Sequence, residues 1–207
     1  MLKIGILGGT FNPIHYAHLF IAQCALEAFG LDKVFFVPNS LPPHKQLAVG
    51  GPSPRDRFEM VRLAIEGNPA FEALDIELLR GEVSYTVDTV KALKQQYAQD
   101  RLYYLAGLDS LLYYRWKAMD ELLETIDGFI AVNRPGAGFA AFETWKPESG
   151  LKHLDKFLQL SIPDVFLSGS LIRERLEQGL CVKYLLPGKV ENYIKKARLY
   201  QNQGVKS

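Results

Sequence analysis

Two histidines three residues apart follow a pair of glycines near the start of the chain, where the sequence reads GGTFNPIHYAH over residues 8–18. Glycines allow a main chain to approach a ligand closely, and a helix start offers N–H groups and partial positive charge that suit phosphate. At this spacing His15 and His18 fall on one side of a helix, so both rings can donate hydrogen bonds to a phosphate. The plain alternative is a tight turn followed by a histidine-capped helix.

A second candidate phosphate segment lies near the other end of the chain, where residues 168–173 read SGSLIR. Ser168 or Ser170 can cap the helix that is expected to begin here. The guanidinium fork of Arg173 matches the oxygens of a phosphate. Alone this is a common capping pattern. Together with the histidine segment it predicts two halves of one triphosphate cradle.

Strand-like and helix-like segments alternate along the chain and must position these two motifs. Strands are expected over residues 3–8, 33–38, 72–77, 101–106 and 128–132, with a sixth over 158–162 or 165–167. Helices are expected over residues 16–29, 54–66, 86–97, 170–178 and 189–198, and a long surface loop over 135–153. This alternation predicts a single α/β domain over residues 1–200, a parallel sheet with helices on both faces, and a polar tail over 201–207.

Composition narrows the classes of partner. A formal net charge of +1 over 207 residues gives no basic surface of the kind that drives nucleic-acid binding. No apolar run approaches the roughly 18 residues that span a bilayer, so we expect no membrane partner. Cys24 and Cys181 lack metal-type spacing and fit a reduced, cytoplasmic protein. The sequence leaves open whether the chain forms a homo-oligomer.

These motifs resemble a known family. The GTFNP run over residues 9–13 with His15 and His18 resembles the signature of the nucleotidylyltransferase superfamily, whose members have a Rossmann-like fold. The SGSLIR segment resembles the second signature, which holds ATP phosphates. Within the superfamily, the chain is similar to bacterial nicotinate-nucleotide adenylyltransferases from residue 3 to about residue 195. It departs from their usual pattern at Asn12, Ala17 and Gly169, where Asp, Gly and Ser are common.

Four further segments carry the narrower resemblance: PPHK at 42–45, SYTVDT at 84–89, GLDS at 107–110 with Trp116 behind it, and NRPG at 133–136. The resemblance implies that residues 84–89 meet the nicotinate carboxylate and that Trp116 covers the pyridine ring. The physics agrees, because N–H groups at a helix start capped by Ser84 favour a carboxylate over a neutral carboxamide. Lys45 can reach a phosphate, and Asp109 can accept ribose hydroxyls. The plain alternatives are a surface lysine, a capped helix, a core tryptophan and a helix cap.

The resemblance assigns each candidate residue a role. Catalytic roles fall to His15, His18 and Arg173. ATP binding falls to Gly8, Gly9, Thr10, Phe11, His18, Gly107, Asp109, Ser168, Ser170 and Arg173. Substrate binding falls to Lys45, Ser84, Tyr85, Thr86, Trp116 and Arg134. No residue is expected to bind a metal directly, and Mg²⁺ is expected to arrive with ATP, held by phosphates and water.

The implied reaction joins the adenylyl group of ATP to nicotinate mononucleotide, giving nicotinate adenine dinucleotide and pyrophosphate in NAD biosynthesis. No nucleophile stands beside a base in the sequence, so direct in-line attack by the substrate phosphate is expected. Two alternatives stay open. One is an adenylyltransferase for another phosphate ester, such as nicotinamide mononucleotide or phosphopantetheine. The other is a nucleotide-binding module without catalysis. A nucleic-acid-handling protein related to the tRNA synthetases is disfavoured by chain length and near-zero charge.

Overall fold

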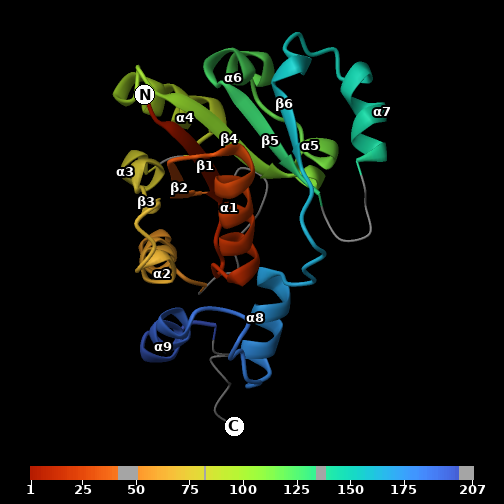
Figure 1. Cartoon of the computed structure of the whole chain (residues 1–207). Helices are drawn as coiled ribbons and strands as arrows, with labels where there is room; N and C mark the ends of the chain where they lie inside the picture. The colour runs from red at the N-terminus through yellow and green to blue at the C-terminus, as the bar shows by residue number, and fades with distance from the viewer. Residues whose placement is uncertain (42–50, 82, 134–138, 201–207) are drawn as a thin grey trace.

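A computed structural model describes residues 1–41, 51–81, 83–133 and 139–200 of the chain (Figure 1). Six parallel strands form one sheet in the order β3-β2-β1-β4-β5-β6. Their bounds are β1 Lys3–Gly9, β2 Lys33–Pro38, β3 Phe71–Ala73, β4 Arg101–Gly107, β5 Gly128–Val132 and β6 Phe157–Leu160. This confirms the single α/β domain with a Rossmann-like parallel sheet.

Helices cover both faces of the sheet. One face carries α1 Tyr16–Phe29, α2 Pro54–Ile65, α8 Gly169–Glu177 and α9 Gly188–Lys196, whose apolar side chains share one core cluster. The other face carries α4 Thr86–Gln96, α5 Leu108–Tyr113, α6 Met119–Thr125 and α7 Ala140–Glu148, which share a second cluster. The short α3 Ile76–Arg80 and a 3-10 turn at Leu154–Lys156 complete the described elements. In Figure 1, α8 and α9 lie together beyond one end of α1.

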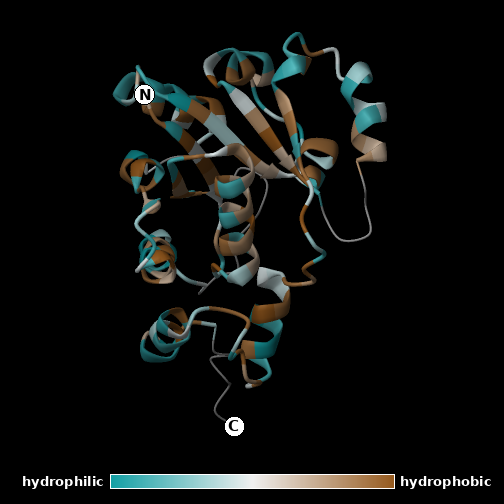
Figure 2. Ribbon diagram, viewed as in Figure 1, coloured by the Kyte–Doolittle hydropathy of each residue, from teal (hydrophilic) through white to brown (hydrophobic). Residues whose placement is uncertain are grey.

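The strand sequences explain the two-sided core. Along β1, Ile4 and Ile6 are fully buried in one cluster, whereas Leu7 packs in the other. Parallel strands buried on both faces read as near-continuous apolar runs, and Figure 2 shows hydrophobic residues running through the sheet with hydrophilic residues on the outer helix surfaces. Among the described residues, no helix is long and apolar enough to cross a membrane.

Two predicted elements are wrong. The expected strand over 72–77 is shorter, because β3 ends at Ala73 and α3 takes residues 76–80 before Gly81 ends it at φ +69°. The expected surface loop over 135–153 holds a helix, α7, whose Phe142 is fully buried against Phe157. The sixth strand is the first of the two options. The short helices α5 and α6 were not predicted.

The sheet order places a crevice at one edge. β1 lies between β2 and β4, so the connections that leave β1 and β4 diverge to opposite faces. In an open parallel sheet, ligands bind outside the carboxyl ends of the strands at this point of divergence. Both the glycine turn after β1 and the Gly107 turn after β4 lie there.

We expect the substitution Ser53→Ala to lower stability, because Ser53 closes a capping box at the start of α2. Its Oγ accepts from the Asp56 N–H at 3.1 Å, and an Asp56 carboxylate oxygen accepts from the Ser53 N–H at 2.9 Å. Losing such a cap costs about 1 kcal/mol, or about 2–4 °C in Tm for a chain of this size. Thermal melting checks this, with exposed Ser161→Ala as the matched control. Equal melting temperatures for the two variants would contradict the role of the cap.

Candidate active site

A single cleft of about 2000 Å³ opens at the carboxyl ends of β1 and β4. Its volume exceeds the ~300–1,000 Å³ of an ordinary small-molecule pocket, so it has room for two nucleotides. It is lined by every candidate site residue that the structure describes: Gly8, Gly9, Thr10, Phe11, His15, His18, Ser84, Tyr85, Thr86, Gly107, Asp109, Trp116, Ser168, Ser170 and Arg173. Lys45 and Arg134 lie outside the described residues. The roles assigned to these residues stay predictions.

The turn between β1 and α1 is held by two guanidinium groups from distant parts of the chain. Arg57 of α2 is fully buried and donates to the Thr10 carbonyl at 2.7 Å and to the Ser40 carbonyl at 2.8 Å. Arg173 of α8 donates to the Asn12 carbonyl at 2.7 Å. Hydrogen bonds from charged donors are roughly twice as strong as neutral ones. The turn therefore has a fixed path, and the two predicted phosphate segments meet.

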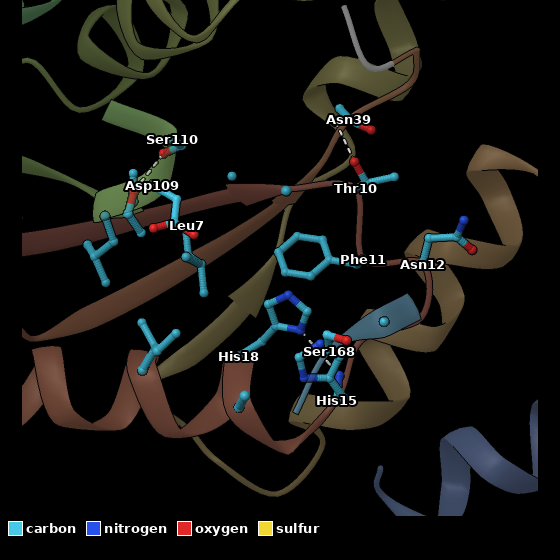
Figure 3. A pocket seen from close by; sticks show the side chains of 18 of the residues that line it. Leu7, Thr10, Phe11, Asn12, His15, His18, Asn39, Asp109, Ser110 and Ser168 are labelled. Carbon is cyan, nitrogen blue, oxygen red and sulfur yellow. Dashed lines mark hydrogen bonds between the residues drawn. The ribbon is translucent and has the colours of Figure 1, made fainter. Parts of the chain in front are cut away.

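The two imidazoles pack against each other at the start of α1, with ring centroids 3.9 Å apart and ring planes tilted by 31° (Figure 3). The backbone N–H of His15 donates to Nδ1 of His18 at 3.3 Å. A neutral His18 ring therefore carries its proton on Nε2, which makes that nitrogen a hydrogen-bond donor. His15 is 5% exposed, and burial lowers its pKa to about 4. His15 is therefore neutral at pH 7. The alternative of a histidine-capped helix is present in the structure, because the His18 ring accepts from the N–H of the N-cap residue His15, and the phosphate-binding role of the pair stays a prediction.

Phe11 packs against the histidine pair through the His18 ring. Its backbone has φ +46°, in the left-handed region that few non-glycine residues occupy. The turn directs the phenyl ring inward, where it is 2% exposed and meets the His18 ring edge-on with centroids 5.1 Å apart. A Cβ on Gly9 would lie 3.2 Å from the same ring. Phe11 therefore lines the cleft next to His18, and the lack of a side chain at Gly9 leaves room for the phenyl ring.

Asn12 connects the turn to the end of the described chain. Its side chain points away from the imidazoles in Figure 3, and its Oδ1 accepts from the Tyr200 hydroxyl at 2.6 Å. Burial raises the pKa of Tyr200 well above its usual value, while Arg173 and Arg57 oppose that shift. The phenol thus remains protonated as a donor. Asn12 is fixed twice, through its carbonyl by Arg173 and through its side chain by Tyr200.

Gly169 explains one departure from the family pattern. A Cβ at this position would lie 2.9 Å from the Asn12 carbonyl oxygen and 3.3 Å from Nη1 of Arg173. The start of α8 therefore packs against the turn at a distance that only glycine allows. Ser168 caps α8, accepting from the Leu171 N–H at 3.2 Å, as one of the two options predicted. Ser170 accepts from Arg173 at 3.1 Å.

The opposite end of the cleft is formed by the start of α4. The prediction that Ser84 caps this helix is wrong, because Tyr85 is the N-cap and the buried Ser84 Oγ has no hydrogen-bond partner among the described residues. Ser84 comes one residue too early for its hydroxyl to reach the first-turn N–H groups. Thr86 lies within 3.4 Å of the Tyr104 hydroxyl. Among the described residues nothing occupies the Ser84 hydroxyl, so it remains available to a ligand in the cleft.

A buried network behind α4 holds this helix start in place. Thr89 donates to Glu77 at 2.7 Å, and Arg80 donates to Thr89 at 3.1 Å and to the Asp88 carbonyl at 3.0 Å. Burial raises the pKa of the Glu77 carboxyl. These bonds join α3 to the first turns of α4.

One aromatic and one acidic candidate residue, Trp116 and Asp109, also line the cleft. Trp116 donates from Nε1 to the Ser110 carbonyl at 2.7 Å and packs edge-on against Tyr104 and Phe129. It is half-buried, so part of the indole remains at the cleft surface. Asp109 lies in the first turn of α5, two residues after Gly107. Both are positioned by the turn that follows β4.

Two residues that hold the site, Arg57 and Tyr200, were not predicted from the sequence to have a role in it. Arg57 was placed on a helix but not assigned a role, although Met60 and Val61 lie three and four residues further on and mark a buried face. That spacing could have identified it as a buried charge. Tyr200 carried no signal, since it follows a predicted helix in a polar stretch.

Comparison with known proteins agrees with this geometry. A family model described as Cytidylyltransferase-like matches residues 6–175. The nicotinate-nucleotide adenylyltransferase of Bacillus subtilis (strain 168) is 40% identical over 203 residues, covering 98% of this chain and 100% of that protein. The chain belongs to the nicotinate-nucleotide adenylyltransferase family. A relative from Dictyoglomus thermophilum is 42% identical over 205 residues, covering 96% of this chain and 100% of its own.

Solved structures extend the family's fold to distant members. Plasmodium falciparum nicotinic acid mononucleotide adenylyltransferase complexed with APC matches with a TM-score of 0.74 at 20% identity, covering 97% of this chain and 98% of that one. The same protein complexed with NaAD matches equally well. At this identity the likeness concerns the fold.

We expect Gly169→Ala to reduce activity about tenfold or more, because the added Cβ pushes α8 away from the Asn12 carbonyl. Overpacking of this kind also costs about 1–3 kcal/mol of stability. Steady-state kinetics and thermal melting check both effects. Gly188→Ala is the matched control, since a Cβ there meets nothing within 4 Å. Wild-type kinetics in Gly169→Ala would show that the close approach does not matter for catalysis.

We expect stability to fall as the pH drops from about 6.5 toward 4, partly through His15. In this window the unfolded chain binds a proton at position 15 that the folded protein, with its pKa of about 4, excludes. The limiting effect is about 3 kcal/mol. Melting temperatures of wild type and His15→Asn across pH 4–7 check this, and the variant should lose stability less steeply. Parallel pH curves would rule out His15 as a source of the dependence.

Proposed function

We propose that the protein transfers the adenylyl group of ATP to nicotinate mononucleotide, forming nicotinate adenine dinucleotide and pyrophosphate in NAD biosynthesis. The observation that carries this proposal is the junction of residues 8–18 with residues 168–173, made by Arg173 and the Asn12 carbonyl at 2.7 Å. Family membership supports the choice of substrates. The cleft of about 2000 Å³ has room for both reactants at once.

In this reaction a 5′-phosphate oxygen of the mononucleotide attacks the α-phosphorus of ATP, and pyrophosphate leaves with the electrons of the broken P–O bond. Such transfers depend on positioning and on stabilising charge around the phosphorus. His18 supports this with a donor at Nε2, held in orientation because its Nδ1 accepts from the His15 N–H. The neutral His15 ring packs beside it, with ring centroids 3.9 Å apart.

The leaving pyrophosphate is assigned to the start of α8. The helix N-terminus offers backbone N–H groups to an anion, and Ser168, Ser170 and Arg173 line the cleft beside them. Arg173 already donates to Asn12 and Ser170, so its guanidinium is held in place before ATP arrives. Gly8, Gly9 and Thr10 bring the main chain close to the phosphates, and Gly107 and Asp109 are assigned to the adenosine ribose.

The mononucleotide is assigned to the start of α4. Backbone N–H groups there, with the unpartnered Oγ of Ser84, favour a carboxylate over a carboxamide. Trp116 supplies a flat face for the pyridinium ring. Tyr85 and Thr86 line the same end. Lys45 and Arg134, which lie outside the described residues, remain assigned to the substrate on the resemblance alone.

Mg²⁺ enters with ATP as part of the substrate in this proposal. Among the described residues, no group of three or more histidine, cysteine, aspartate or glutamate side chains is placed to hold a metal ion. We assign the magnesium ion to the phosphate oxygens of ATP and to water, which are the ligands that Mg²⁺ keeps in sites of this kind. The two described cysteines form no disulfide, which agrees with the proposed cytoplasmic location.

A pyrophosphate-release assay tests the function. Wild-type protein with ATP, Mg²⁺ and nicotinate mononucleotide should release pyrophosphate and form nicotinate adenine dinucleotide in equal amounts. Nicotinamide mononucleotide and phosphopantetheine serve as competing acceptors. Faster turnover with phosphopantetheine would overturn the proposed substrate. ATP binding without pyrophosphate release from any acceptor would instead favour the nucleotide-binding module.

We expect His18→Ala to lower kcat about 100-fold or more, because loss of one donor to the transition state typically costs that much. Thermal melting should stay close to wild type. His153→Ala is the matched control, since His153 lies near Glu124 on the surface and away from the cleft. Near-normal turnover in His18→Ala would remove the proposed catalytic role.

A further inference from the structure

We propose that Lys117 is a specificity-determining residue, whose ammonium group favours a carboxylate over a carboxamide on the pyridine ring of the mononucleotide. This inference rests on the proposed function and deepens it. It assigns part of the acid-over-amide preference to one exposed side chain, in addition to the helix start. It also predicts that this part of the preference depends on salt.

The ammonium of Lys117 is held at the start of α4 by an aromatic ring. Its Nζ lies 3.9 Å from the ring centroid of Tyr85, the N-cap residue of that helix. A cation over an aromatic face at this distance is attracted to the ring. Both residues line the cleft. The charge therefore stands beside the first turn of α4.

An independent feature marks the same place as an anion site. Ser84 is 7% exposed, lines the cleft, and has a hydroxyl with no hydrogen-bond partner among the described residues. Buried polar groups are rarely left unpaired, and each exception calls for a reason. An acceptor bound at this end of the cleft would satisfy the Ser84 hydroxyl. The first backbone N–H groups of α4, an 11-residue helix, lie next to it.

The segment that carries Lys117 is fixed on both sides. On one side, Trp116 is tied through Nε1 to the Ser110 carbonyl at 2.7 Å. On the other, Ala118 adopts φ +49° and begins α6, which packs against α4. Non-glycine residues in this left-handed region are uncommon and persist where the surroundings require them. This turn directs the chain from the cleft wall into α6 and leaves Lys117 facing Tyr85.

Other charged side chains also line the cleft, among them Arg115, two residues before Lys117, and Glu77. Glu77 accepts from Thr89 at 2.7 Å, and burial raises its pKa. A carboxylate gains attraction from a neighbouring ammonium, whereas a neutral carboxamide gains almost none. Two unit charges about 4–5 Å apart at a water-exposed site attract each other enough for about a fivefold change in binding. Exposed charges are also screened by salt.

The experiment compares kcat/KM for nicotinate and nicotinamide mononucleotides in wild type, Lys117→Met, Lys117→Arg and Lys91→Met. Lys91 lies on α4 and pairs with Glu121, outside the cleft, so it controls for the loss of one surface cation. We expect Lys117→Met to lower the acid-to-amide ratio about fivefold, chiefly through KM for the acid. Lys117→Arg and Lys91→Met should keep the wild-type ratio. Raising the salt concentration should reduce the ratio of wild type more than that of Lys117→Met.

A double-mutant cycle with Tyr85→Leu tests the aromatic support. If the ring holds the ammonium, the effect of Lys117→Met on the ratio should shrink in the Tyr85→Leu background. An unchanged acid-to-amide ratio in Lys117→Met, with normal folding by thermal melting, would overturn the inference. That outcome leaves the proposed function intact. Wild-type protein that turns over neither mononucleotide would overturn the proposed function instead.

Discussion

Two guanidinium groups hold one short turn by its main-chain carbonyls, and the rest of the site depends on this arrangement. Arg57 reaches the turn from α2 and Arg173 reaches it from α8. Because both bonds go to backbone atoms, they fix the path of the turn itself. The positions of the imidazoles, the Phe11 ring and the start of α1 follow from that path. Burial lowers the pKa of the Arg57 guanidinium, and Tyr200 and Glu77 oppose this shift.

The candidate site combines helix starts and imidazole rings with charged side chains of both signs. The starts of α1, α4 and α8, two neighbouring histidines and three arginines, Arg115, Arg173 and Arg198, line a single cleft. A buried imidazole that stays neutral can pack against its neighbour without repulsion, which two imidazolium rings could not do. Lys117 is an exposed cation that lines the same cleft, and the proposed preference for the acid rests in part on it. A site whose imidazole at His15 is neutral suits a reaction that depends more on positioning the reactants than on proton transfer.

Much of this could be predicted from the sequence, for reasons that particular residues show. Helix α1 has apolar spacing that stops at Gly30, so its bounds were predicted correctly. Residues 8–18 and 168–173 each follow a strand and open a helix, and strand ends in a parallel sheet meet at one edge. The failures have physical causes. Residues 72–80 are apolar at alternate and helical spacings alike, and α7 carries Pro147 within an aromatic stretch that has no clear period. Arg57 forms its bonds with residues 17 and 47 positions away, which no local pattern reveals.

The hydrogen bond between Tyr200 and Asn12 joins positions 188 residues apart. Along the chain, Asn12 precedes β2 and all later described strands, whereas Tyr200 follows all of them. The sheet therefore contains none of the segment after α9, whereas the cleft depends on that segment for Arg198 and Tyr200 in its lining. Detaching this last segment would leave all six strands in place but would remove the Tyr200 hydroxyl from Asn12 and two residues from the cleft lining.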